Sequence, residues 1–177
     1  MKNFSLKFID IMIGIVLGLG FQWWPALTEP WQYIAFIFVY IDIIDYWIDY
    51  SPSLKKFPPK RELDIILDVA IMFALFLYIY TTQLTIIYFL TAFVVFKIFD
   101  LLWLVRARIQ YHPHAAKDTF LQTWITINTI EATLTAGLII ATTHFVLAPL
   151  TALIIFIATR IFLRICASLR YQKIHLS

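Results

Sequence analysis

The sequence has little of what most enzymes and disulfide-bonded proteins are built from. Of its 177 residues, four are glycine, one is cysteine and only 14% are charged. A single cysteine, Cys166, can supply neither a disulfide framework nor a cysteine metal cluster. The chain also has no P-loop, nucleophile elbow or HExxH motif. We therefore expect a protein that is not an enzyme and that holds no metal or other cofactor.

Apolar surface is what the sequence has in abundance. Hydrophobic residues make up 62% of the chain and aromatic residues 18%, which is well above the usual range of soluble domains. A soluble domain of this length has too little interior for so much apolar surface, whereas lipid solvates it. The composition predicts an all-α protein that forms one integral membrane domain over residues 1–177, in contact with lipid.

Six apolar runs are long enough to cross the hydrocarbon core of a bilayer, for which a helix needs about 20 residues. They lie at 5–27, 32–50, 62–81, 84–106, 119–142 and 147–170. Asp10 lies inside the first run and no small-residue cleavage site follows it, so we interpret that run as a span rather than a signal peptide. The prediction is a polytopic bundle of six transmembrane helices.

The connections between these runs differ in charge. The two long ones, SPSLKKFPPKR at 51–61 and RIQYHPHAAKD at 108–118, are basic, as are both ends of the chain. The short connections at 28–31, 81–83 and 143–146 contain no lysine or arginine. Since basic residues stay on the cytoplasmic side, this pattern predicts a plasma (inner) membrane protein with both termini cytoplasmic. It also explains the net charge of +3 without nucleic acid.

Polar residues recur at an offset of about 60 residues, which suggests three two-helix repeats. The aligned residues are Asp10, Asp68 and Asn128 in the first helix of each unit and Asp42, Asp100 and Arg160 in the second. Regular spacing of six apolar helices also produces such an alignment, so both explanations stay open.

Three aspartates interrupt the second apolar run, within FVYIDIIDYWIDYSP at 38–52. Asp42, Asp45 and Asp49 follow the spacing i, i+3, i+7 and therefore share one helix face. A charged side chain at the centre of the bilayer costs about 2.5–3.5 kcal/mol, so this face should line the bundle interior or a wet cavity. Carboxylates that crowd together repel one another until protons or cations bind. We predict an ion- or substrate-binding vestibule, and its members are Asp42, Asp45, Asp68 and Asp100.

Basic residues at similar depth predict partners for these acids. Glu131 and Arg160 should form a buried ion pair or gate between the last two helices. Arg164, one turn beyond Arg160, is expected to neutralise Asp100 or Asp42, and Lys97 is expected to pair with Asp100 at i+3.

The fifth run carries two polar stripes. Five threonines form one of them, and Asn128, Glu131 and Thr135 form the other. A helix with two polar stripes is poorly suited to face lipid, so we expect it at the centre of the bundle or at a contact between copies.

Two functional hypotheses follow. The leading one is a small, homo-oligomeric channel or transporter for a cation, a proton or a cationic solute. The alternative is a non-transporting membrane anchor or sensor, which binds a soluble cytoplasmic protein through 51–61 and 108–118, as in a secretion or defence assembly.

Overall fold

The computed structural model describes residues 2–111 and 119–170, and over these residues it is helical, with no strand. The described part contains six α-helices and two short 3₁₀ segments. In chain order they are α1 (Lys2–Gly20), η1 (Phe21–Ala26), α2 (Pro30–Lys56), α3 (Glu62–Tyr80), η2 (Thr81–Gln83), α4 (Ile86–Tyr111), α5 (Thr119–Phe145) and α6 (Pro149–Arg170).

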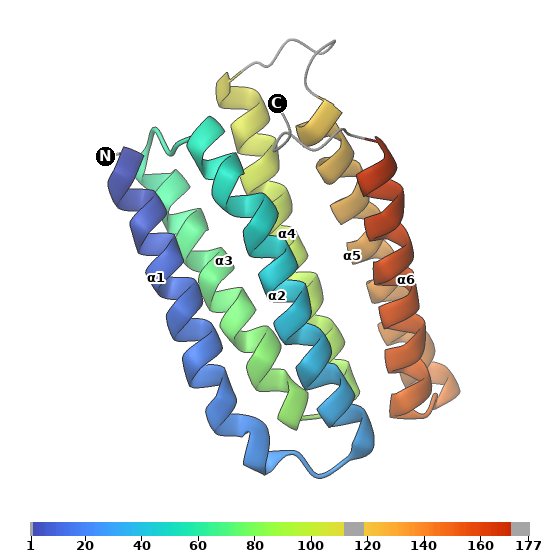
Figure 1. Cartoon of the computed structure of the whole chain (residues 1–177). Helices are drawn as coiled ribbons and strands as arrows, with labels where there is room; N and C mark the ends of the chain where they lie inside the picture. Colours follow the sequence, from blue (N-terminus) through green and yellow to red (C-terminus); the bar gives the residue numbers. More distant parts are fainter. Residues whose placement is uncertain (1, 112–118, 171–177) are drawn as a thin grey trace.

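The helices form an up-and-down bundle in which each runs opposite to the one before it (Figure 1). One end holds the start of α1, the end of α6 and the α2–α3 connection, and we call it the termini end. The other holds the α1–α2, α3–α4 and α5–α6 turns, and we call it the hairpin end. With this connectivity α2, α4 and α6 all run from the hairpin end to the termini end (Figure 1).

Local signals fix the helix starts at both ends of the bundle. At the hairpin end Pro30 is the first residue of α2, and Gln32 Oε1 accepts hydrogen bonds from the backbone N–H of Thr28 at 2.8 Å and of Glu29 at 3.0 Å. Proline suits a first helical position because it has no N–H to satisfy there. At the termini end the Asp64 carboxylate accepts the N–H of Arg61 at 2.9 Å. These contacts satisfy backbone donors that a helix leaves unpaired.

Two helices continue at least five residues beyond their predicted ends. The apolar run of α2 stops at Tyr50, but the helix reaches Lys56 and includes Pro52; α4 likewise continues to Tyr111. The reason is that a helix needs apolar side chains only where it crosses hydrocarbon, whereas its backbone hydrogen bonds form equally well in the polar region beyond. The connection predicted at 51–61 is therefore half helical.

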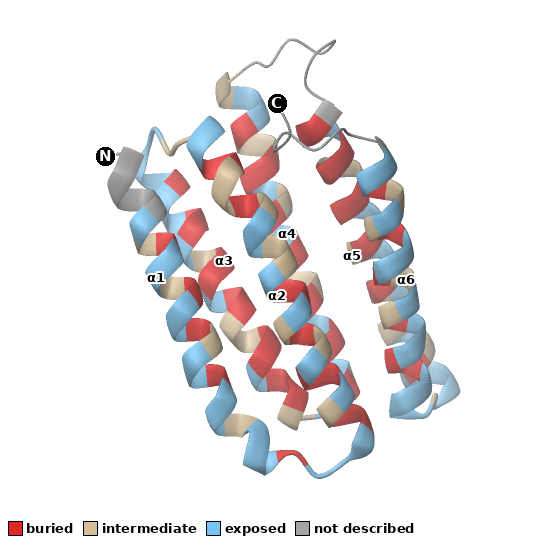
Figure 2. Cartoon of the chain, in the orientation of Figure 1, coloured by how far each residue is buried: buried red, intermediate tan, exposed pale blue. Residues whose placement is uncertain are grey.

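Five helical segments are long and apolar enough to cross a membrane, among the residues described. They are Lys7–Ala26, Glu62–Gln83, Ile86–Tyr111, Phe120–Phe145 and Pro149–Leu169. Figure 2 shows the buried residues facing neighbouring helices, while the outward faces are exposed, and those faces carry large apolar side chains such as Ile11, Phe73 and Phe162. The chain thus has the build of a membrane protein. The sixth helix, α2, carries the three aspartates and is not one of these five segments.

The α5–α6 pair lies at one side of the bundle, beside α2 and α4 (Figure 1). The prediction of a central fifth helix is therefore wrong, and a contact between copies at α5 stays a prediction. The hydroxyls of Thr126, Thr129 and Thr133 bond to carbonyls of their own helix, at 2.8–3.0 Å. Because such bonds satisfy the hydroxyls internally, a threonine stripe can face outward without unpaired polar groups.

Candidate functional site

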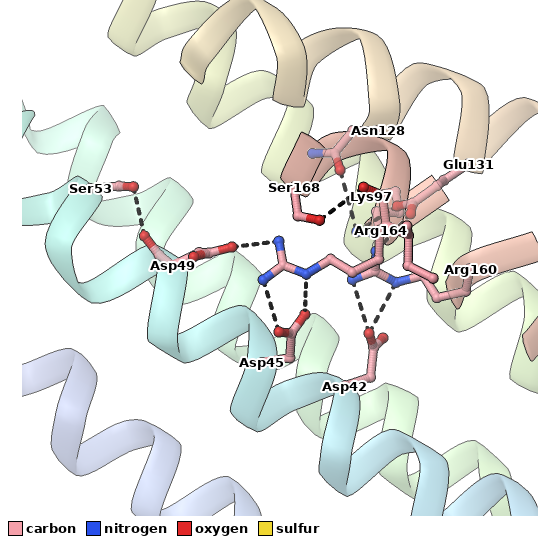
Figure 3. A network of polar contacts seen from close by, with 11 residues as sticks. Asp42, Asp45, Asp49, Ser53, Lys97, Asn128, Glu131, Arg160, Arg164 and Ser168 are labelled. Carbon is pink, nitrogen blue, oxygen red and sulfur yellow. Dashed lines mark hydrogen bonds and ion pairs between the residues drawn. The ribbon is translucent and has the colours of Figure 1, made fainter. Parts of the chain in front are cut away.

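Arg160 of α6 lies between carboxylates from two other helices (Figure 3). Its Nε and Nη2 contact Asp42 Oδ1 of α2 at 3.0 and 2.9 Å, and its Nη1 contacts Glu131 Oε1 of α5 at 2.7 Å. All three side chains are buried. One guanidinium therefore links α2, α5 and α6 in the interior, with the short, charge-assisted geometry that makes such contacts strong.

The network continues from Glu131 to α4. Lys97 Nζ lies 2.9 Å from Glu131 Oε2 and 3.3 Å from Asn128 Oδ1. The amide of Asn128 donates to Asp100 Oδ2 at 2.6 Å, and Tyr46 of α2 donates to Asp100 Oδ1 at 3.1 Å. Lys97 is only 1% exposed, so its ammonium group depends on these partners for the solvation it has lost.

Arg164 repeats the arrangement one turn closer to the termini end. It contacts both Asp45 oxygens, at 2.7 and 2.8 Å, and Asp49 Oδ2 at 2.5 Å. Its guanidinium also lies 4.9 Å from the ring centre of Trp124 on α5. The Arg164 side chain is 22% exposed, so this part of the network is wetter than the part around Arg160.

Carboxylates outnumber cations in the two groups of contacts around Arg160 and Arg164, which line one cavity and which we together call the charged network. The carboxylates are Asp42, Asp45, Asp49, Asp100 and Glu131, and the cations are Lys97, Arg160 and Arg164. Carboxylates crowded in this way are a physical reason for the network to bind protons or small cations, because they repel one another until one of them is protonated or a cation binds.

Asp68 of α3 lies beside the charged network rather than in it. Its Oδ1 accepts a 2.7 Å hydrogen bond from Tyr50, and the Tyr50 ring stacks on that of Tyr46 at 5.0 Å. Tyr46 in turn bonds to Asp100. Two stacked tyrosines therefore separate Asp68 from the network.

Two cavities meet at Arg160. The first, of about 30 Å³, lies toward the termini end; polar groups of Asp45, Asp49, Asp100 and Arg164 contribute to its wall. The second, of about 230 Å³, lies between α5 and α6 toward the hairpin end and is mostly apolar apart from Glu131, Arg160 and two threonines. Since Arg160 lines both, the Arg160–Glu131 pair stands between them.

Aromatic rings close the bundle between the charged network and the hairpin end. We call Tyr78, Phe89, Phe93 and Phe156 the aromatic plug. Phe156 lies 5.6 Å from Phe89 and 4.8 Å from Phe93 between ring centres, and both rings also contact Tyr78. All four residues are buried. Beyond the plug, the helix starts at the hairpin end enclose a groove of about 570 Å³ that includes Glu29 and Gln32.

The structure places the predicted site residues as follows. Asp42, Asp45 and Asp100 are in the charged network, Asp68 lies beside it, and Glu131 and Arg160 contact each other. Arg164 contacts Asp45 and Asp49 instead of Asp100 or Asp42, and Lys97 contacts Glu131 instead of Asp100. Both corrections have one reason: depth along a helix follows from residue count, but the direction in which a long side chain extends depends on the neighbouring helices.

Sequence reasoning missed the tyrosines. Tyr46 and Tyr50 directly follow Asp45 and Asp49, so the repeated Asp-Tyr pair was the signal that could have identified them. It also missed the role of Asp64, which accepts hydrogen bonds from Arg106 and Gln110 of α4 at 2.8 Å each. That contact fastens the α2–α3 connection to the end of α4.

Comparisons of the chain with protein-family models, with curated proteins and with solved structures found no match. The geometry of the charged network is therefore the basis for a functional proposal.

Proposed function

We propose that the protein is a membrane transporter or channel that moves protons or small cations through the charged network. In this proposal α2 also crosses the membrane, and the basic termini end faces the cytoplasm. The observation that carries the proposal is the position of Arg160 and Glu131 between two cavities. A purely structural ion pair needs no cavity on either side.

The cytoplasmic cavity would serve as the entry site. Three aspartates contribute to its wall, and its volume of about 30 Å³ is enough to hold a water molecule. A small acidic site of this kind suits a proton on water or a small cation. Size and charge together narrow the proposed substrate to these ions.

The Arg160 pair would serve as the gate. Protonation of Asp42 or Glu131 removes one of the negative charges that hold the guanidinium and so weakens the contact between helices. A proton that arrives at one carboxylate and leaves toward the other cavity needs no co-reactant: an O–H bond forms at the carboxylate on arrival and breaks on departure. The aromatic plug closes the other side, as alternating access requires.

The alternative, a non-transporting anchor, is favoured by one observation. Each cation of the charged network has a carboxylate partner, as a network that only holds helices together would require. However, the predicted docking segment 51–61 is engaged by the bundle itself. Tyr111 donates a hydrogen bond to the carbonyl of Pro58, and the Lys60 ammonium lies 3.9 Å from the Tyr111 ring centre. Most of the second segment, 108–118, lies outside the described residues.

Flux measurements in proteoliposomes test the proposal. Purified protein is reconstituted with pH-sensitive and with K⁺- or Na⁺-sensitive dyes, and an ion gradient is applied. We expect wild-type flux of one of these ions and loss of most of it when Asp42→Asn and Asp45→Asn are combined. Asp10→Asn is the matched control, because Asp10 is an exposed carboxylate that accepts a hydrogen bond from Trp47 outside the network.

Two results would count against transport. One is absence of flux for every ion in folded wild-type protein, which would favour the anchor. The other is equal flux in the wild type and in the double variant, which would move the ion path away from the charged network.

A further inference from the structure

Tyr78 differs from its neighbours in the aromatic plug by a single hydroxyl group. Its side chain is 0% exposed, and its ring lies 5.1 Å from that of Phe89 and 5.5 Å from that of Phe93. The other members of the plug are phenylalanines. Packing therefore accounts for an aromatic ring at this position but does not account for the hydroxyl.

The hydroxyl of Tyr78 is buried without a hydrogen-bond partner among the described residues. An unpaired buried hydroxyl is destabilising, because its bonds to water are lost and not replaced. Phenylalanine would fill the same space without that cost. An orphan polar group in an apolar core therefore needs an explanation other than stability.

The surroundings of this hydroxyl connect it to the gate. The charged groups Asp42, Arg160 and Glu131 lie near it. Both contacts from Arg160 to Asp42 end on Oδ1, and within the described chain no hydrogen bond to Oδ2 is found. Phe93, which contacts the Tyr78 ring, also lines the 230 Å³ cavity. Tyr78 thus lies where the plug, the gate and that cavity adjoin.

We propose that Tyr78 relays protons across the aromatic plug, through a water molecule shared with the free oxygen of Asp42. This inference rests on the proposed transport function and narrows its substrate to the proton. As a proton reaches the Tyr78 oxygen from the cavity side, the hydroxyl releases its own proton to the bridging water, which passes one to Asp42. Each O–H bond that breaks is matched by one that forms, and Tyr78 ends the step neutral.

Tyr78→Phe removes only the relay atom, and Tyr88→Phe is the matched control. Tyr88 is 59% exposed on the outside of α4, so its hydroxyl lies away from the network. We expect Tyr78→Phe to keep or raise the unfolding temperature while proton flux in proteoliposomes falls about 100-fold, near the lower end of what a positioned proton-transfer group contributes. Tyr88→Phe should leave both unchanged.

The outcomes distinguish failure of the Tyr78 relay from failure of the proposed transport function. Proton flux in the wild type that survives in Tyr78→Phe overturns the relay and leaves the transport function in place. No flux in the wild type overturns both. Flux of Na⁺ or K⁺ without protons also overturns the relay, because a hydroxyl cannot pass a metal cation along hydrogen bonds.

A second variant keeps the ring and the hydroxyl. Fluorinated tyrosine at position 78 has a more acidic phenol, so a relay through its hydroxyl predicts a changed rate of proton flux. A tyrosine with only a packing role predicts an unchanged rate, and that result would overturn the inference even if Tyr78→Phe failed to fold.

Discussion

Replacing Arg160 by methionine removes the side chain that joins Asp42 to the rest of the charged network. Methionine fills much of the volume and leaves two carboxylates behind. Glu131 keeps Lys97, whose Nζ lies 2.9 Å away. Asp42 keeps no cation among the described residues, and its side chain is only 7% exposed. The variant therefore creates one uncompensated buried charge.

The magnitude follows from burial. Breaking a buried ion pair from one side costs about 3–5 kcal/mol, because the remaining charge is left without solvation. Arg164→Met provides the comparison: Arg164 is 22% exposed and its partners Asp45 and Asp49 are 37% and 15% exposed, so water replaces the lost contacts. For such a pair we expect about 1 kcal/mol or less.

Reversible unfolding in mixed detergent micelles measures both variants under one set of conditions. The double variant Asp42→Asn with Arg160→Met is the critical test. It removes the stranded charge together with the cation, so it should recover most of the stability that Arg160→Met loses. Equal costs for Arg160→Met and Arg164→Met, or no recovery in the double variant, would refute the reasoning from burial.

Two further predictions concern the frame around the site. Gly20→Ala should lower the free energy of unfolding by about 1–3 kcal/mol, since the added methyl would lie 2.5 Å from the Tyr40 hydroxyl and 3.0 Å from Ile79. The control is Gly14→Ala, whose added methyl meets nothing within 4 Å and should stabilise the protein by up to about 1 kcal/mol. Thermal unfolding compares the two variants. Asp64→Ala should cost about 2 kcal/mol and speed amide exchange over residues 60–64, because it removes the acceptor that starts α3 and fastens it to α4. Glu62→Ala, at an exposed position in the same turn, should change neither quantity, and equal exchange in the two variants would contradict the anchoring role of Asp64.

The helices could be predicted from apolar runs because each span needs a nearly fixed number of residues. The ends of the helices could be predicted less well. The segment Ser51 to Lys56 has the composition of a loop, yet it extends α2, with Ser53 bonded to the carbonyl of Asp49 at 2.7 Å. Polarity shows where hydrocarbon ends but does not show where a helix ends.

The candidate site was predictable in membership but not in pairing. A helix rises about 1.5 Å per residue, so the depths of Glu131 and Arg160 could be compared without a structure. The choice between Asp42, Asp45, Asp49 and Asp100 as partners of Arg164 could not, because it depends on which helix lies beside α6. The network also depends on neutral groups, above all Asn128, whose amide connects Lys97 to Asp100.

The helix that lies beside α6 is α2, and the direction of α2 explains the spacing of its aspartates. Because α2 and α6 run the same way (Figure 1), Asp42, Asp45 and Asp49 rise beside Arg160 and Arg164, and each aspartate contacts one of the two arginines. Alone in a bilayer, each central aspartate would cost about 2.5–3.5 kcal/mol, which is why α2 is not among the helices that apolarity alone would place in a membrane. In the proposed arrangement, α2 can cross only once α6 has supplied its cations. The same dependence makes the contact between the α2 aspartates and the α6 arginines suited to gating, because one proton added to an aspartate changes how firmly the two helices are held together.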